Sequence, residues 1–117
     1  TMSLNIDLIK SMNYEEAINL FNKIESNDIN SNEYKVTIND KSKLESLNNT
    51  FKYLIELNRK AETEIITELD LENREFKDDM FKILTLCTNF KDLTHLYFNN
   101  YYISEKGMKY LSKCEFL

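Results

Sequence analysis

His95 is the residue best suited to chemistry in this 117-residue chain, because it is the sole histidine and histidine exchanges protons near neutral pH. On a strand it would project to the same side as Tyr97, with Glu68 and Asp70 on the neighbouring strand. A histidine beside carboxylates is a frequent general-base arrangement. A complete site also needs a nucleophile, a glycine loop or an oxyanion-binding group, and the sequence places none beside these residues. We therefore expect a non-enzymatic protein.

Cys87 and Cys114 are the remaining residues with redox or metal chemistry. Two thiols and one histidine are too few for the ligand clusters that hold zinc. The helical phase of both cysteines directs them toward the core, where a free thiol packs as a small apolar group. We therefore expect two buried free cysteines, and neither a metal ion nor a cofactor.

An internal repeat contains His95 and both cysteines, because the segments 66–90 and 93–117 are two copies of one pattern. Identical residues stand at Thr67/Thr94, Leu69/Leu96, Asn73/Asn100, Lys82/Lys109, Leu84/Leu111 and Cys87/Cys114. Apolar residues stand at Ile66/Leu93, Leu71/Phe98, Phe76/Ile103, Phe81/Met108, Ile83/Tyr110 and Phe90/Leu117. A repeat of this length indicates units that bury their apolar faces by stacking on each other. This organisation favours a binding function.

Each copy changes its apolar period in the middle, which indicates a strand, a turn and a helix. Leu69 and Leu71, like Leu96 and Phe98, alternate with other residues as in a strand with one buried face. The later apolar positions have helical spacing, at Met80, Phe81, Leu84 and Cys87 in the first copy and at Met108, Leu111 and Cys114 in the second. Residues that favour helix starts precede them, Asp78 and Asp79 in one copy and Ser104 and Glu105 in the other. The pattern predicts two strand-turn-helix units that share a parallel sheet.

This pattern resembles the leucine-rich repeat superfamily, in particular its ribonuclease-inhibitor-like and cysteine-containing subclasses. The family pattern runs L-x-x-L-x-L, then Asn or Cys, an isoleucine, a D-x-G step, a leucine and a helix cysteine. The matching residues are Leu93, Leu96, Phe98, Asn100, Ile103, Gly107, Leu111, Cys114 and Leu117. The resemblance covers residues 66–117 and is weaker for residues 34–60. It implies a short α/β solenoid whose concave strand side binds proteins.

The resemblance also gives a role to Asn73 and Asn100, because in that family the asparagine closes a turn by hydrogen bonding to the backbone. Both residues stand one position earlier than the family spacing, which we interpret as a shortened turn. Gly107 is the only glycine of the chain, and Met80 takes its place in the first copy. The two copies therefore differ at this step of the pattern.

A degenerate third unit precedes the two copies, and in it Val36 and Ile38 align with Leu69 and Leu71 of the first copy. Val36 and Ile38 alternate with polar residues, which predicts a strand over residues 34–38. Ser42 and Glu45 form a capping-box pattern. The apolar stripe that follows contains Leu44, Leu47, Phe51, Leu54 and Ile55. We predict a helix from about residue 43 to residue 60.

The N-terminal segment, residues 1–33, is expected to form a helical cap at one end of the stack, although its helices also fit a small bundle or a flavodoxin-like layer. Asn13 and Glu16 mark a helix start. One face of this helix, which extends to about residue 25, contains Tyr14, Ala17, Ile18, Phe21 and Ile24. Leu4, Ile6 and Leu8 fit either a short strand or a short helix. The predicted single domain thus consists of a cap (1–33), a degenerate repeat (34–65) and two repeats (66–92 and 93–117).

Composition excludes several classes of function. The net charge is −5 and the isoelectric point is about 4.9, whereas nucleic-acid-binding proteins concentrate lysine and arginine on one face. No apolar run approaches the roughly 20 residues of a membrane-spanning helix. The N-terminus also lacks the basic and apolar regions of a signal peptide. We expect a cytoplasmic protein that binds neither nucleic acid nor membrane.

The strand residues that point away from the core are the candidate partner-binding residues. They are Glu68, Asp70 and Glu72 on one strand, His95, Tyr97 and Asn99 on the next, with Tyr101 and Tyr102 at the rim. The degenerate unit would add Lys35, Thr37 and Asn39 to this surface. Carboxylates beside tyrosines suit a basic partner protein. A second hypothesis is a small acidic inhibitor, of the immunity type, that covers the active site of a basic enzyme.

The predicted second repeat leaves one edge of the sheet without a covering strand. Its strand, expected at residues 93–98, has an apolar buried face, and the sequence stops where another unit would begin. Uncovered strand edges tend to pair with other chains. We therefore expect a homodimer through the C-terminal sheet edge, pairing of this edge with a partner, or a chain cut from something longer.

Overall fold

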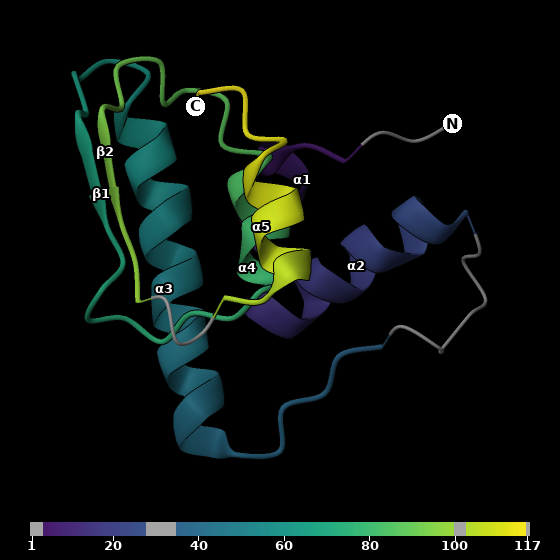
Figure 1. Ribbon diagram of the computed structural model, residues 1–117. Helices are drawn as coiled ribbons and strands as arrows, with labels where there is room; N and C mark the ends of the chain where they lie inside the picture. The colour runs from purple at the N-terminus through teal and green to yellow at the C-terminus, as the bar shows by residue number, and fades with distance from the viewer. Residues whose placement is uncertain (1–3, 28–34, 100–102, 117) are drawn as a thin grey trace.

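The computed structural model describes residues 4–27, 35–99 and 103–116. Its elements, in chain order, are α1 (Ile6–Ile9), α2 (Tyr14–Ser26), α3 (Lys41–Lys60), β1 (Glu68–Asp70), α4 (Met80–Leu84), β2 (His95–Tyr97) and α5 (Glu105–Leu111). The described residues thus form a mixed α/β structure that is mostly helical and has a parallel sheet of two strands (Figure 1). None of the helices in these ranges is long and apolar enough to cross a membrane.

The two strands pair in the register that the repeat predicts. Glu68 lies opposite His95, and Asp70 lies opposite Tyr97. The ladder continues beyond the strands, because the Thr67 carbonyl accepts the backbone N–H of His95 at 3.1 Å and the Tyr97 carbonyl accepts that of Leu71 at 2.7 Å. The prediction of a parallel sheet in which equivalent residues of the two copies face each other is confirmed.

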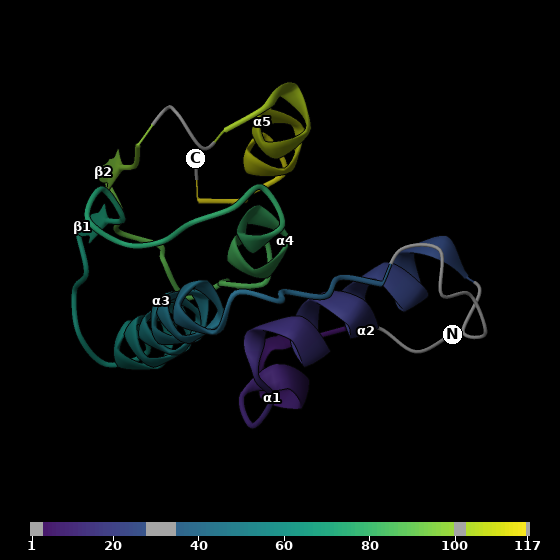
Figure 2. The ribbon, with the colours of Figure 1, turned by 90° about the horizontal axis from the view of Figure 1, so that it is seen from below.

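Three layers lie one above another in Figure 2: α3, then β1 with α4, then β2 with α5. In each of the last two layers the strand lies on one side of the molecule and the helix on the other. The helix α4 packs against α2, α3 and α5, and all five of its residues are buried. The first repeat therefore occupies the centre of the molecule, and the second repeat lies at its end.

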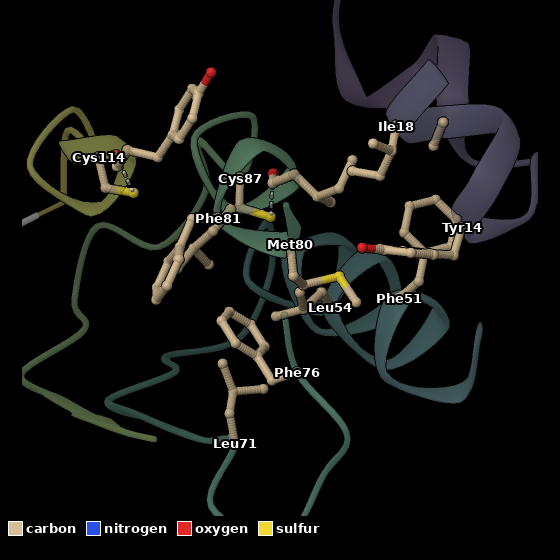
Figure 3. Close-up of a cluster of buried hydrophobic side chains, with 14 of the residues drawn as sticks. Tyr14, Ile18, Phe51, Leu54, Leu71, Phe76, Met80, Phe81, Cys87 and Cys114 are labelled. Atoms are coloured by element: carbon tan, nitrogen blue, oxygen red, sulfur yellow. Dashed lines mark hydrogen bonds between the residues drawn. The ribbon is translucent and has the colours of Figure 1, made fainter. Parts of the chain in front are cut away.

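The core fills the space between the sheet and the helices (Figure 3). Its largest fully buried side chains are Tyr14, Phe51, Phe81, Phe90, Ile9, Ile18, Leu47, Leu54, Leu69, Leu71, Met80 and Ile83. The ring of Phe81 makes edge-to-face contacts with Phe76 at 4.7 Å and with Phe98 at 6.2 Å between centroids. Such pairs add to the stabilisation from burial. Phe81 joins the first repeat to the second.

The cysteines occupy equivalent places in the two repeats, as their spacing predicts. Both are free and buried. The Cys87 thiol donates to the carbonyl of Ile83, and the Cys114 thiol donates to the carbonyl of Tyr110, four residues back in each case (Figure 3). The prediction of two buried free thiols is confirmed.

The N-terminal helices follow the capping signals in the sequence. Asn13 accepts the backbone N–H of Glu16, and the Glu16 side chain accepts that of Asn13, which completes a capping box at the start of α2. Leu4, Ile6 and Leu8, which fitted a strand or a helix, belong to α1 and its approach. The Asn5 side chain caps α1 by accepting the N–H of Leu8. The helical prediction for this region is confirmed.

The predicted strand at residues 34–38 is wrong over its described part, residues 35–38. The backbone there is hydrogen-bonded by side chains of α2 instead of a neighbouring strand. Asn19 accepts the N–H of Val36 at 2.6 Å and donates to its carbonyl, and Glu15 accepts the N–H of Ile38 at 2.9 Å. Alternating apolar residues are also what an extended segment needs to pack on a helix, so the pattern did not separate the two cases.

The helix α3 begins two residues earlier than predicted. Asp40 is its N-cap and accepts the backbone N–H of Lys43 at 3.1 Å. The capping box predicted at Ser42 is therefore wrong, because a carboxylate that is one of the strongest N-cap groups precedes it. The predicted end at residue 60 is confirmed.

The helix starts of the two repeats are joined by Asp78. The Asp78 carboxylate accepts both the backbone N–H of Ser104, at 3.0 Å, and its hydroxyl. Asp79 and Ser104 occupy the N-cap positions of α4 and α5, which confirms the predicted helix starts, but neither makes a side-chain cap hydrogen bond within its own helix. The cap of α5 comes from the preceding repeat. A Cβ on Gly107 would overlap Asp78 Oδ1, so the only glycine permits this close approach.

Candidate protein-binding face

Alternation along β1 and β2 separates a buried side of the sheet from an exposed side. Leu69 is fully buried and Leu96 is half-buried, whereas Glu68, Asp70, His95 and Tyr97 are exposed. A one-residue change of register would exchange these sides, and the paired ladder excludes it. We name the exposed side, with Glu72, the strand face.

The strand face brings together acids and aromatic rings from different repeats. The parallel register sets Glu68 beside His95 and Asp70 beside Tyr97, at the strand separation of roughly 4.8 Å. The rings of His95 and Tyr97 stack, with centroids 5.9 Å apart and an angle of 17° between their planes. The stacked rings form a flat aromatic surface next to two carboxylates.

Hydrogen bonds orient the His95 ring. The Thr94 hydroxyl lies 3.1 Å from the Thr67 carbonyl and 2.9 Å from His95 Nδ1. The hydroxyl has a single proton, so it donates either to the Thr67 carbonyl or to Nδ1, and the tautomer of His95 decides which. The other nitrogen, Nε2, is the one left to meet a partner.

Asp70 has a structural role as well as an exposed position. Its Oδ1 accepts the backbone N–H of Glu72 at 3.0 Å, which is an Asx turn that ends the strand. Glu72 is exposed just beyond this turn. The column of three acids therefore continues from the strand into the turn, and its middle member is held in place by the backbone.

The remaining predicted residues are only partly placed on this face. Asn99 follows β2 and is half-buried, while Tyr101 and Tyr102 lie outside the described residues. The expectation that Lys35, Thr37 and Asn39 extend the strand face is wrong, because β1 pairs with no strand except β2 in the described part of the chain. Asn73, predicted to close a turn, is exposed, and Asn100 lies outside the described ranges.

The arrangement around His95 contains the predicted acid neighbours but no metal-binding cluster. In the part of the chain that the structure describes, no group of three or more histidine, cysteine or acidic residues could hold a metal ion. What the strand face offers chemically is negative charge, hydrogen-bond acceptors and a stacked aromatic pair. These groups suit recognition of a cationic surface.

Sequence reasoning missed Lys82, which is buried with a relative exposure of 3%. Its Nζ donates to Asn22 Oδ1 at 2.5 Å and lies 3.4 Å from Asp79 Oδ1. Lysine is almost never fully buried without partners. One signal in the sequence could have indicated this burial: Lys82 stands between Phe81 and Ile83 in a short apolar helix. A helix that is apolar on all sides is surrounded by other elements, so a lysine in it is buried as well.

Comparison of the chain with protein-family models, with curated proteins and with solved structures found no match in any of the three. The geometry of the chain's own residues is therefore the basis for any statement about function.

Proposed function

We propose that this protein is a non-enzymatic, leucine-rich-repeat-like binding module that engages a basic partner protein with its strand face. One observation carries the proposal: the pairs Glu68/His95 and Asp70/Tyr97 are in register and all four side chains are exposed. Glu68 and Asp70 are two residues apart on β1 and project to the same side of the sheet. Two negative charges this close repel each other unless a positive charge compensates. A cationic partner would provide that compensation.

The composition of the strand face matches the known anatomy of protein interfaces. Tyrosine is enriched at interfaces because it offers a large ring and a polar end. The ring of Tyr97 is already held by stacking on His95, so little side-chain freedom is lost when a partner binds. The carboxylates of Glu68 and Glu72 would mainly accelerate association with a positively charged surface.

The repeat-like character of residues 66–116 supports a solenoid-type use of this face. A single alignment of the two copies matches two structural features. It pairs the residues that lie opposite each other in β1 and β2, and it pairs Cys87 with Cys114, whose thiols each donate to the carbonyl four residues back. Repeats that stack in this way place their strand side chains in columns. In binding proteins these side chains form the binding surface, and the helices serve as the scaffold. Under this proposal α2, α3, α4 and α5 support the strand face and do not contact the partner.

The test is a comparison of binding by two variants with the same change of charge. Glu68→Lys/Asp70→Lys alters the strand face, and Glu45→Lys/Glu115→Lys alters two exposed acids elsewhere. Proteins captured from native lysate by wild type are purified and titrated against both variants. We expect the strand-face variant to weaken binding at least about a hundredfold, equivalent to about 2.8 kcal/mol, and the control variant to weaken it less than about threefold.

Two outcomes would reject the strand face. Equal weakening by both variants would mean that only the overall negative charge matters. Retention of full affinity by the strand-face variant, with an unchanged circular dichroism spectrum, would move the binding site elsewhere. If the captured partner is a basic enzyme that wild type inhibits, the protein is an inhibitor of the immunity type, and the same variants measure how much the carboxylates contribute.

The open edge of β2 supports a second proposal, a homodimer through the C-terminal end of the sheet. His95 and Tyr97 use their backbone groups toward β1, so the N–H and C=O of the intervening Leu96 point away from β1. In the described residues no third strand covers this edge. Unpaired edges of this kind readily accept another strand.

The solution mass over a wide range of protein concentration tests the dimer. We expect sedimentation to give a mass that rises from one chain toward two, and the backbone N–H of Leu96 to become protected from hydrogen exchange as it does. A mass of one chain at every concentration would reject the homodimer and leave the strand-face proposal unaffected.

A further inference from the structure

We propose that a cavity on the helix side of the molecule is a binding site for a small organic anion, with Lys82 as its buried cation. The cavity has a volume of about 500 Å³ and lies between α2, α4, α5 and the extended segment before α3. Its lining residues include Asn22, Glu25, Lys35, Asp79, Lys106 and Tyr110. This volume is in the range of small-molecule sites, roughly 300–1,000 Å³. The cavity is separate from the strand face.

The position of Lys82 is the first reason for the proposal. Its side chain is only 4% exposed, yet it contributes to the cavity lining. Taking an ammonium group out of water costs several kcal/mol, and an apolar residue of similar length would avoid that cost. The ammonium donates one hydrogen bond, to Asn22, and forms an ion pair with Asp79 at 3.4 Å, whereas a lysine has three N–H donors. Among the described residues, the hydrogen bond to Asn22 and the ion pair with Asp79 leave donor capacity for an oxygen of a ligand.

The aromatic side chains around Lys82 are the second reason. Its Nζ lies 5.8 Å from the centre of the Phe21 ring and 5.3 Å from that of Tyr110. These rings hold the ammonium by cation–π attraction and limit the access of water to it. An anion that reaches such a partly desolvated ammonium gains more Coulomb energy than it would at the protein surface.

The balance of charge is the third reason. Three lysines, Lys35, Lys82 and Lys106, line the cavity with two acids, Glu25 and Asp79. Both acids are already engaged, Asp79 by Lys82 and Glu25 by the Tyr110 hydroxyl at 2.7 Å. The lining therefore carries one excess positive charge in a chain whose net charge is −5.

This charge balance selects the class of ligand. A carboxylate neutralises the excess charge of the lining, and a phosphate monoester, with a charge of about −1.5 to −2 near pH 7, more than neutralises it. The exposed Lys35 and Lys106 stand where an entering anion meets them before it reaches Lys82. The ring of Tyr110 offers a flat apolar surface to the body of the ligand. A small carboxylic acid or a small phosphate ester fits these constraints.

Nuclear magnetic resonance titration tests the site with two probes, inorganic phosphate and benzoate, each at constant ionic strength maintained with sodium chloride. In the wild-type protein we expect saturable shifts of the backbone amide signals of Asn22, Lys82 and Tyr110 with at least one probe. Saturation by benzoate alone would assign a carboxylate ligand, and saturation by phosphate alone would assign a phosphate ester. Absence of saturable shifts with both probes would overturn the proposal.

Matched lysine variants make the test specific. Lys35→Gln/Lys106→Gln removes two exposed charges at the cavity, and Lys52→Gln/Lys91→Gln removes two exposed charges that do not line it. We expect the first variant to weaken binding at least about fivefold and the second to weaken it less than about twofold. Equal weakening would show that only general electrostatic attraction is measured, and the proposal would fail.

Lys82→Met addresses the buried cation itself. We expect a folded variant to lose saturable binding of the probe. A folded variant that binds as tightly as wild type would mean that Lys82 only joins α2 to α4, which would overturn its assigned role. If the variant does not fold, the decision rests on the two exposed pairs, because they require no change in the core.

Discussion

The two repeats carry the same pattern of residues but differ in how deeply they are buried. In the first, Leu69 and Leu71 are fully buried and every residue of α4 is buried. In the second, Leu96 and Phe98 are half-buried, and Met108 on α5 is 49% exposed. The difference follows from position: in the described part of the chain α4 packs against α2, α3 and α5, whereas β2 pairs with β1 alone and α5 packs on α4 and touches α2 through Tyr110.

The shared sequence pattern therefore determines the backbone geometry of each repeat but not how much each repeat contributes to the free energy of unfolding. Both repeats form a three-residue strand in register and both direct a thiol back to a helix carbonyl. In stacked repeats, stability comes largely from the contacts between neighbours. An equivalent residue therefore contributes more in the central repeat than in the terminal one.

The largest effect that would break or support this comparison is expected from leucine truncation at equivalent positions. Leu69→Ala leaves a cavity in the fully buried core and should lower the free energy of unfolding by about 3–4 kcal/mol. Leu96→Ala removes a half-buried side chain and should cost about 1 kcal/mol. Urea unfolding monitored by circular dichroism measures both.

Equal losses at Leu69 and Leu96 would contradict the assignment of central and terminal repeats. A loss at Leu96 that grows with protein concentration would have another meaning, because it would show that a second copy covers β2 and buries this side chain. Leu96→Ala thus connects the comparison of the repeats to the proposed dimer.

Thiol reactivity should differ between the equivalent cysteines. Burial raises the pKa of Cys114 to about 11, so at pH 8 only about 0.1% of it is thiolate, the reactive form. Burial, followed by the nearby Cys114, raises the pKa of Cys87 further. We expect Cys114 to react with a disulfide reagent about a hundredfold more slowly than an exposed thiol, and Cys87 more slowly still.

Single variants Cys87→Ala and Cys114→Ala let each thiol be measured alone, and the unfolded chains serve as the reference for full reactivity. Because both pKa values are higher in the folded chain, unfolding releases thiol protons above about pH 8.5, and stability should fall as the pH rises beyond that point. Faster reaction at Cys87 than at Cys114 would contradict the deeper burial of the first repeat.

Local signals and the repeat were sufficient to predict much of this fold. Asn13 and Glu16 predicted the start of α2 because a capping box acts between residues close in sequence. The alignment of Leu69 with Leu96 predicted the sheet register, since two copies of one pattern can be compared within a single sequence.

The errors arose where a distant side chain decides the outcome. The segment with Val36 and Ile38 has the alternation of a strand, but Asn19 and Glu15 take its backbone hydrogen bonds. The cavity around Lys82 was missed for the same reason, because Asn22 is 60 residues away in sequence. The alternation on the strand face placed Glu68 and His95 together, whereas nothing in the spacing of the lysines indicated that Lys35 and Lys106 line the cavity with Lys82.

The smallest effect concerns Gly107, which stands where the first repeat has Met80. Alanine there brings a Cβ into overlap with Asp78 Oδ1, so the carboxylate must move away from Ser104 and lose hydrogen bonds worth about 1 kcal/mol each. Alanine also favours a helix over glycine by about 1 kcal/mol. We expect Gly107→Ala to lower the free energy of unfolding by about 1 kcal/mol in the wild-type background.

The same substitution should change sign once Asp78 is removed. In an Asp78→Ala background the overlap with the carboxylate and the hydrogen bonds to Ser104 are both absent. The other close neighbour of the added Cβ, Phe81 Cδ2 at 3.1 Å, must still shift slightly, so the helical preference should make Gly107→Ala stabilising by less than about 1 kcal/mol. Urea unfolding of the four proteins in this cycle gives the coupling energy. A destabilisation of the same size in both backgrounds would mean that Gly107 is required within α5 for a reason independent of Asp78. A change from destabilisation to stabilisation would mean that Gly107 makes room for Asp78 to accept the hydrogen bonds of Ser104. The cap of α5 would then depend on contact between the two repeats and not on the second repeat alone.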